Sequence, residues 1–132
     1  MKAIGIDYGK KRLGVASCDP DGRVAFAACL VDGTKSLRAQ FAAVYAKYSP
    51  EAVVVGNPLS LSGEPGPMSA RAAQFAQKLD SWFGVPVHLW DERMTSAQAQ
   101  RGLPAGAAKG ERDLAAAVLI LQSWLDARRA DT

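Results

Sequence analysis

The sequence is poor in the residues that build thiolate metal centres and histidine-based active sites. Its 132 residues include two cysteines and one histidine. Cys18 and Cys29 are expected roughly 20 Å apart along two strands of a predicted hairpin, which is too far for a disulfide. The cysteines and His88 lack the spacing of a zinc module, and no serine stands where it would pair with that histidine in a triad. We expect His88 to be an ordinary strand residue.

Long apolar runs and a strong net charge are also missing. No run approaches the ~20 apolar residues that a membrane-spanning helix needs, and the first residues lack the pattern of a signal peptide. We therefore expect a cytoplasmic protein with no membrane partner. The formal net charge of +3 is mild and does not by itself indicate a nucleic-acid partner. Neither a complete P-loop nor a G-x-G-x-x-G motif is present, which argues against the common nucleotide-binding folds.

Apolar periodicity predicts a single α/β domain that covers residues 1–132. The predicted elements are strands at 3–8, 12–18 and 23–31, a helix at 37–48, a strand at 52–55, a helix at about 68–83, a strand at 85–90, a short helix at about 95–101 and a helix at 111–129. The first three strands form an antiparallel meander, and the later strands are linked by helices, which favours parallel pairing. The main order, βββ-α-β-α-β-α, predicts a mixed five-stranded sheet flanked by helices on both faces.

Two loops stand out between these elements. Residues 56–67 are rich in glycine and proline, which rules out regular structure there, and residues 102–110 form a second loop. Long loops inside compact domains tend to be functional or mobile. The first loop is therefore expected to guide or cover a substrate.

Acidic residues occur where several predicted elements should meet at one edge of the sheet. Asp7 lies near the C-terminal end of the first strand, Asp91 and Glu92 follow the last strand, and Asp113 lies in the first turn of the last helix. Open α/β sheets bind their ligands at that edge. Because adjacent strand residues point to opposite faces, only one of Asp91 and Glu92 is expected to reach a shared site.

Each acid also has an explanation that involves no ligand. Asp7 alone is equally well explained as a cap of the turn at Gly9, and an acid after a strand often precedes a helix. Acids such as Asp113 are common in the first turn of a helix, and Glu111 competes with it there. Taken together, three carboxylates at one edge can hold two divalent cations about 4 Å apart. Hard oxygen ligands suit Mg²⁺ or Mn²⁺.

The motifs, taken as a set, resemble the YqgF (RuvX) family. Four blocks carry the resemblance in order along the chain: residues 5–9 with 12–16, residues 54–59 with 63–67, Asp91-Glu92-Arg93-Met94-Thr95, and Asp113-Leu114-Ala115-Ala116. Members of this family are bacterial RNase H-like nucleases related in fold to RuvC. They are described as Holliday junction resolvases and as nucleases that mature the 5′ end of pre-16S rRNA.

The resemblance implies an RNase H-like fold and a metal-dependent enzyme. Asp7, Glu92 and Asp113 would be the acidic triad, both catalytic and metal-binding, and would hold Mg²⁺ or Mn²⁺, with two ions expected. The residues expected to contact the substrate are Lys10, Lys11, Arg12, Asn57, Arg93 and Thr95. The sequence departs from the family pattern in two places. Asn57 stands where leucine is frequent, and the stretch 99–112 is short and poor in lysine.

The predicted activity is hydrolysis of phosphodiester bonds in structured nucleic acid, leaving 5′-phosphate and 3′-hydroxyl ends. Processing of the 5′ end of pre-16S rRNA in ribosome biogenesis is the leading assignment, and resolution of Holliday junctions in DNA recombination is the alternative. The expected partner is therefore pre-rRNA or branched DNA, and the sequence leaves monomer and homodimer open. Two other classes are a non-catalytic nucleic-acid-binding domain and an ATPase of the actin and sugar-kinase type, which needs two such lobes where 132 residues supply one.

Overall fold

The computed structural model describes residues 1–59, 62–94 and 109–130. In these ranges the elements are β1 (Ala3–Asp7), β2 (Arg12–Cys18), β3 (Ala25–Asp32), α1 (Leu37–Tyr48), β4 (Ala52–Asn57), α2 (Pro67–Phe83), β5 (Val87–Asp91), the 3₁₀ turn η1 (Glu92–Met94) and α4 (Lys109–Ala130). Within these residues no helix has the length and apolar character needed to cross a membrane. The expected short helix at 95–101, and Thr95 with it, lie outside the described residues.

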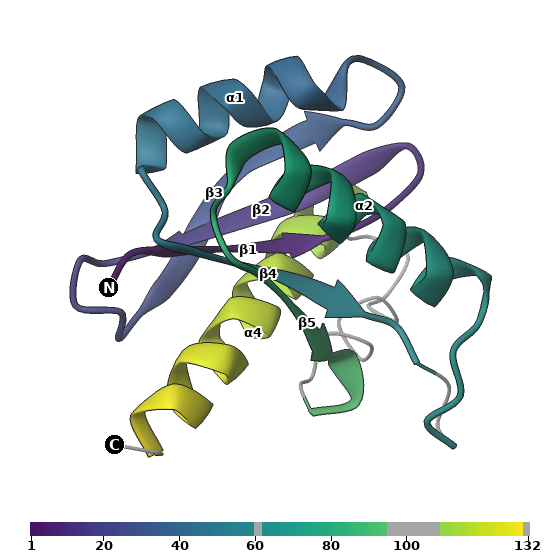
Figure 1. The fold of residues 1–132 in the computed structure, drawn as a ribbon. Helices are drawn as coiled ribbons and strands as arrows, with labels where there is room; N and C mark the ends of the chain where they lie inside the picture. Colours follow the sequence, from purple (N-terminus) through teal and green to yellow (C-terminus); the bar gives the residue numbers. More distant parts are fainter. Residues whose placement is uncertain (60–61, 95–108, 131–132) are drawn as a thin grey trace.

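The strands form one mixed five-stranded sheet in the order β3-β2-β1-β4-β5. β2 pairs antiparallel with both β1 and β3, whereas β4 pairs parallel with both β1 and β5. Helices α1 and α2 lie on one face of the sheet and α4 lies on the other (Figure 1). The predicted α/β architecture, a mixed five-stranded sheet with helices on both faces, is confirmed, and β1 is its central strand.

The face beneath α1 and α2 carries large side chains. Its buried residues are Ile4, Ile6, Leu13, Val15, Val31, Val53 and Val55 from the strands, Phe41 and Val44 from α1, and Ala72, Phe75, Ala76 and Leu79 from α2. Helix α1 begins after Ser36, whose Oγ accepts a hydrogen bond from the Ala39 N–H. It ends at Ser49, which adopts the left-handed conformation directly before Pro50. These residues set the two ends of the helix that covers this apolar face.

The face beneath α4 carries small side chains instead. Its buried strand residues are Ala3, Ala16, Cys18, Ala52 and Val54. Gly5 in the middle of β1 allows the helix to come very close, because a Cβ atom there would lie 2.6 Å from the Cβ atom of Leu121. Glycine inside a strand often marks such a close approach. The helix that carries Asp113 is therefore held directly against the central strand.

The hairpin between β2 and β3 differs from the prediction. β3 begins at Ala25, two residues later than expected, because the Asp19 carboxylate accepts hydrogen bonds from the Arg23 and Val24 N–H groups and keeps them in the turn. The register places Cys18 opposite Ala25, and an irregularity near residue 28 places the other cysteine opposite Val15. Both thiols are free, as predicted.

Candidate active site

Asp7 and Glu92 lie on the α4 face of the sheet, at the C-terminal ends of the parallel strands. Asp7 has the same strand parity as Ala3 and Gly5, which contact α4. Along β5, the Trp90 indole donates a hydrogen bond to Ser123 of α4, and Glu92 continues on that side of the strand. The side chains are almost completely buried, with residue exposures of 4% for Asp7 and 1% for Glu92. Buried carboxylates are rare, and the free-energy cost of burying their charge must be compensated. This pair is therefore a candidate functional site.

Two glycines flank Asp7 on the neighbouring strands, and each makes room for another acid. Asp7 pairs with Gly14 of β2, and the register of β1 on β4 places it beside Gly56 on the other side. A Cβ atom at Gly56 would lie 3.2 Å from the Glu92 side chain, and one at Gly14 would lie 2.1 Å from the Asp113 carbonyl oxygen. The three acids of the predicted triad therefore surround one end of β1.

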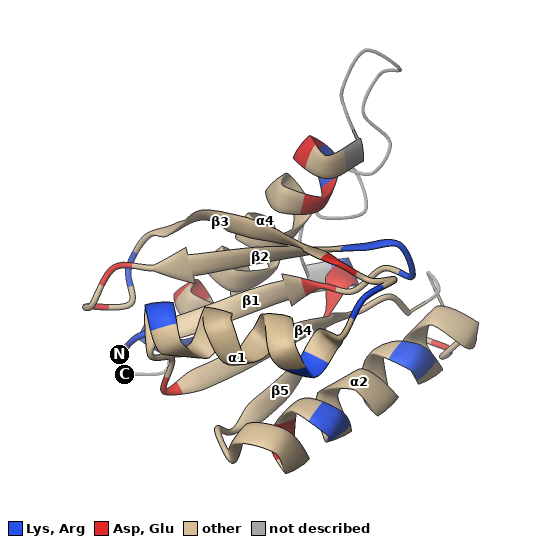
Figure 2. Cartoon of the chain, turned by 90° about the horizontal axis from the view of Figure 1, so that it is seen from above, with Lys and Arg blue, Asp and Glu red and all other residues tan. Residues whose placement is uncertain are grey.

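The third acid of this group is engaged by a basic residue. The Arg12 Nε donates to Asp113 Oδ2 at 3.3 Å, between side chains that are 39% and 24% exposed. Figure 2 shows acidic residues at the end of β1 beside the basic turn that leads into β2. Glu111, the competing candidate in α4, is exposed. The structure thus favours Asp113 over Glu111 as the helix acid nearest the end of β1.

The donor chemistry of this site fits a hard divalent cation. All three predicted ligands are carboxylates, the donor type that Mg²⁺ and Mn²⁺ prefer. In the described ranges, however, no group of three or more His, Cys, Asp or Glu side chains is arranged to hold a metal ion. Asp7 and Glu92 are in place on the α4 face, while the Asp113 side chain is directed to Arg12.

Asp91 has different surroundings from Glu92, because its side chain is paired with Arg93. Its carboxylate accepts hydrogen bonds from the Arg93 backbone N–H at 2.9 Å, from Nε at 3.0 and 3.1 Å, and from Nη2 at 2.7 Å. The hydrogen bonds from Arg93 hold the pKa of Asp91 below its usual range. This bidentate clasp distinguishes the surroundings of the two adjacent acids, because strand parity turns Asp91 away from the face on which Glu92 is buried.

The Arg93 guanidinium also lies against Gly63 in the loop after β4. A Cβ atom at Gly63 would lie 3.1 Å from Arg93 Nη1, and Gly63 has a φ of +90°, which other residues rarely adopt. The clasp therefore joins the turn that carries Glu92 to the loop that was expected to guide the substrate.

The other predicted substrate contacts differ in their exposure to solvent. Lys10 and Lys11 are exposed in the turn after β1. Asn57 is half-buried at the end of β4, and its Oδ1 accepts a hydrogen bond of 2.5 Å from the Oγ of Ser69 in the first turn of α2. His88 packs its ring on Trp124 with centroids 5.5 Å apart, in agreement with the strand reading.

Sequence reasoning missed the residues that shape the site without carrying its charge. Gly14 and Gly56 interrupt apolar strands, and a glycine inside a strand is a recognised signal of close approach. Ser69 offered no such signal, because its hydrogen bond to Asn57 spans the nine-residue loop 58–66, whose sequence has no periodic pattern.

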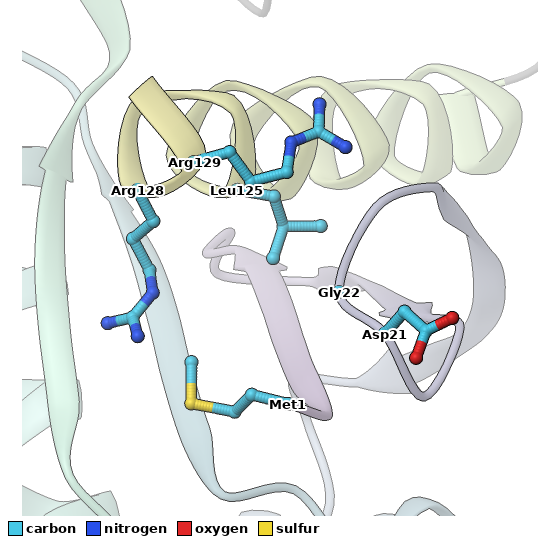
Figure 3. A pocket seen from close by; sticks show the side chains of 6 residues that line it. All are labelled: Met1, Asp21, Gly22, Leu125, Arg128 and Arg129. Atoms are coloured by element: carbon cyan, nitrogen blue, oxygen red, sulfur yellow. The ribbon is translucent and has the colours of Figure 1, made fainter. Parts of the chain in front are cut away.

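A hollow of about 210 Å³ lies at the opposite end of the sheet from the acids. It is lined by Met1, Asp21, Gly22, Leu125, Arg128 and Arg129. Figure 3 shows Arg128 and Met1 on one side of it and Asp21 on the other. The Arg128 guanidinium lies 4.9 Å from the Trp124 ring centre, and Arg129 pairs with Asp126. These charges are used within the protein and stand apart from the carboxylate site.

Comparison with known proteins identifies the family. The RuvX model, described as "Holliday junction resolvase", matches residues 1–127. A protein of Streptomyces coelicolor named "Putative pre-16S rRNA nuclease" is 41% identical over 97% of this chain and 81% of its own length, and one of Syntrophus aciditrophicus with the same name is 40% identical over 96% and 89%. The structure of Thermus thermophilus RuvC is similar at a TM-score of 0.63 and 19% identity, covering 98% of this chain and 97% of its own, which shows the RNase H-like fold. The chain belongs to the RuvX family.

Proposed function

We propose that this protein is a metal-dependent nuclease that hydrolyses phosphodiester bonds in structured RNA, with the 5′ end of pre-16S rRNA as its substrate. The observation that carries the proposal is the pair of buried carboxylates, Asp7 and Glu92, on one face of the sheet, with Gly56 of the intervening strand β4 between them. Membership of the RuvX family and the names of its relatives, which are about 40% identical, support nuclease activity and the choice of RNA.

The acids would act together as ligands of Mg²⁺ or Mn²⁺. Asp7 and Glu92 would supply two ligands from the buried face of the sheet, and Asp113 would supply a third from the start of α4. A pair of divalent cations bound there would activate a water and stabilise the leaving oxygen. Burial of the two carboxylates suits this role, because a nearby cation compensates the cost of keeping them ionised.

The basic turn would position the substrate. Lys10 and Lys11 are exposed beside the carboxylates and would contact backbone phosphates, which orient a nucleic acid without reading its sequence. Asn57 and Arg93 would act mainly by holding Ser69 and Gly63 in position beside the site. We place this activity in the cytoplasm, where ribosomes are assembled.

The test is cleavage of a 5′-extended 16S rRNA fragment by the full chain with Mn²⁺ or Mg²⁺. The wild-type protein should release a product with a 5′-phosphate, and a chelator should stop the reaction. Asp7→Asn should abolish cleavage, whereas Asp80→Asn, which neutralises an exposed acid on α2, should leave it intact. Equal cleavage by the wild-type protein and Asp7→Asn would reject the proposal.

Two alternatives are separated in parallel reactions. A four-way DNA junction cleaved much faster than the RNA would favour the resolvase assignment, which the description of the family model supports. Binding of the RNA without cleavage in either metal would favour a non-catalytic nucleic-acid-binding domain. Binding and cleavage are therefore measured on the same molecules.

A further inference from the structure

The ion pair between Arg12 and Asp113 joins two parts of the site that are 101 residues apart in the sequence. Arg12 opens β2 directly after the basic turn, and Asp113 lies in the first turns of α4. Its Nε–Oδ2 distance is 3.3 Å, and both side chains reach solvent. The pair therefore sits at the border between the buried carboxylates and the surface where a nucleic acid would arrive.

The backbones on both sides of this ion pair are packed or hydrogen-bonded to their neighbours. The carbonyl oxygen of Asp113 packs against Gly14 so tightly that a Cβ atom there would lie 2.1 Å from it. The turn before β2 is anchored as well, because Gly33 donates its N–H to the Lys11 carbonyl at 2.9 Å. A rotation of the Asp113 side chain would leave this backbone contact with β2 in place.

We propose that Arg12 is a positioning residue that holds Asp113 in the free enzyme and exchanges it for a substrate phosphate. Asp113 then turns from Arg12 toward Asp7 and Glu92 and completes the set of metal ligands. This inference rests on the proposed function, because it assumes that those two acids bind the metal. It explains why the described residues contain two buried acids in place and a third acid directed to a basic side chain.

The energetics favour such an exchange. A partly exposed ion pair is weak and is easily replaced, whereas an arginine fork matches the geometry of a phosphate group closely. One carboxylate oxygen of Asp113 is committed to Arg12, so a metal ion and the guanidinium compete for the same side chain. A phosphate that occupies Arg12 removes this competition.

The exchange makes metal binding and substrate binding mutually supportive. By linkage, RNA should raise the affinity for the metal by the same factor by which the metal raises the affinity for RNA. The free protein should bind metal weakly, and should gain its full affinity only when a nucleic acid covers the basic turn. Cleavage of unrelated phosphodiesters would thereby be limited.

The test measures Mn²⁺ binding by calorimetry on the full chain, alone and with a hydrolysis-resistant phosphorothioate RNA hairpin. Arg12→Gln should bind Mn²⁺ roughly threefold to tenfold more tightly than the wild-type protein without RNA, and RNA should no longer change its affinity. Arg12→Lys, which keeps a cation near Asp113, should fall between the two. Lys78→Gln is the matched control, since it removes one charge from an exposed position on α2 and should keep the coupling to RNA.

The sign of the change decides the question. Weaker Mn²⁺ binding by Arg12→Gln, or an affinity and coupling equal to those of Lys78→Gln, would overturn the inference and make Arg12 a simple support of the ligand. Asp7→Asn in the same titration separates the two levels of the argument. If it removes Mn²⁺ binding while Arg12→Gln changes nothing, only the exchange fails. If the wild-type protein binds no Mn²⁺, or Asp7→Asn binds it equally well, the metal site fails and the exchange with it.

Discussion

The two faces of the sheet are built from different residues on the same strands. Beneath α1 and α2 the strands present large side chains such as Ile6 and Val15, and beneath α4 they present alanine, glycine and the buried Asp7. Residues 6 and 7 are neighbours in the chain and face opposite layers. The large side chains bury apolar area, which stabilises the fold. The small ones allow a helix and carboxylates to approach the central strand, which creates a site.

The largest expected contrast is between the buried acids on the α4 face and the apolar residue Ile6 on the other face. Glu92→Gln and Asp7→Asn should lower cleavage at least about a hundredfold and leave the free energy of unfolding unchanged or raised, because neutral groups cost less to bury than charges. Ile6→Ala should instead lower the free energy of unfolding by about 2–5 kcal/mol, because it leaves a cavity in the core. Urea denaturation and cleavage assays on all three variants check this. A large loss of stability in Asp7→Asn would contradict the division between the faces.

A smaller contrast concerns the glycines on the α4 face, which allow the helix to come close to the strands. Gly14→Ala should lower the free energy of unfolding by about 1–3 kcal/mol and reduce cleavage as well, because the new methyl group meets the backbone of Asp113 and displaces the start of α4. The matched control is Gly66→Ala, whose Cβ atom has nothing within 4 Å. Equal stability and activity of the two variants would mean that the close approach of α4 is unimportant.

The sequence was sufficient for the architecture because that depends on local patterns. The apolar periodicities predicted every strand and long helix of the described part within about two residues. β3 was predicted to start too early because the carboxylate of Asp19 accepts hydrogen bonds from the N–H groups of Arg23 and Val24, and this depends on the exact turn.

The acids were predictable for the same reason, whereas their partners were not. The end of a strand can be read from periodicity, so Asp7 and Glu92 could be placed at one edge, and only the structure shows that Glu92 is the buried member of its pair. The contact between Arg12 and Asp113 spans 101 residues, and the clasp on Asp91 depends on a 3₁₀ turn after β5. Such long-range and turn-dependent contacts leave no periodic signal in the chain.

The clasp at the border of the site should give a modest dependence of stability on pH. The hydrogen bonds from Arg93 lower the pKa of Asp91 in the folded protein, so folding favours the ionised form. This stabilisation is complete above the unfolded pKa of about 3.9 and is lost as the pH falls through the lower folded value. Removing the clasp should cost less than about 1 kcal/mol, because it is partly exposed.

The measurement compares the wild-type protein with Asp91→Asn between pH 6 and pH 3. The difference in unfolding free energy between them should shrink as the pH falls, while the contributions of Asp19 and Asp32, whose pKa values are also lowered, cancel because both proteins contain them. A difference that is constant with pH would show that ionised Asp91 contributes nothing through Arg93.

The smallest expected effect distinguishes the two faces by the reactivity of their thiols. Cys18 is buried on the α4 face and accepts a hydrogen bond from the Ala3 N–H, whereas Cys29 is half-buried against the α1 side. Burial raises the pKa of both thiols, so little thiolate is present at neutral pH. Both should react with a disulfide reagent more slowly than free cysteine at pH 7.5, and Cys18 more slowly than Cys29. Single Cys→Ser variants assign the two rates, and a faster Cys18 would show that α4 lifts from the sheet more readily than α1. That result would also weaken the fixed position of Asp113 on which the exchange with Arg12 depends.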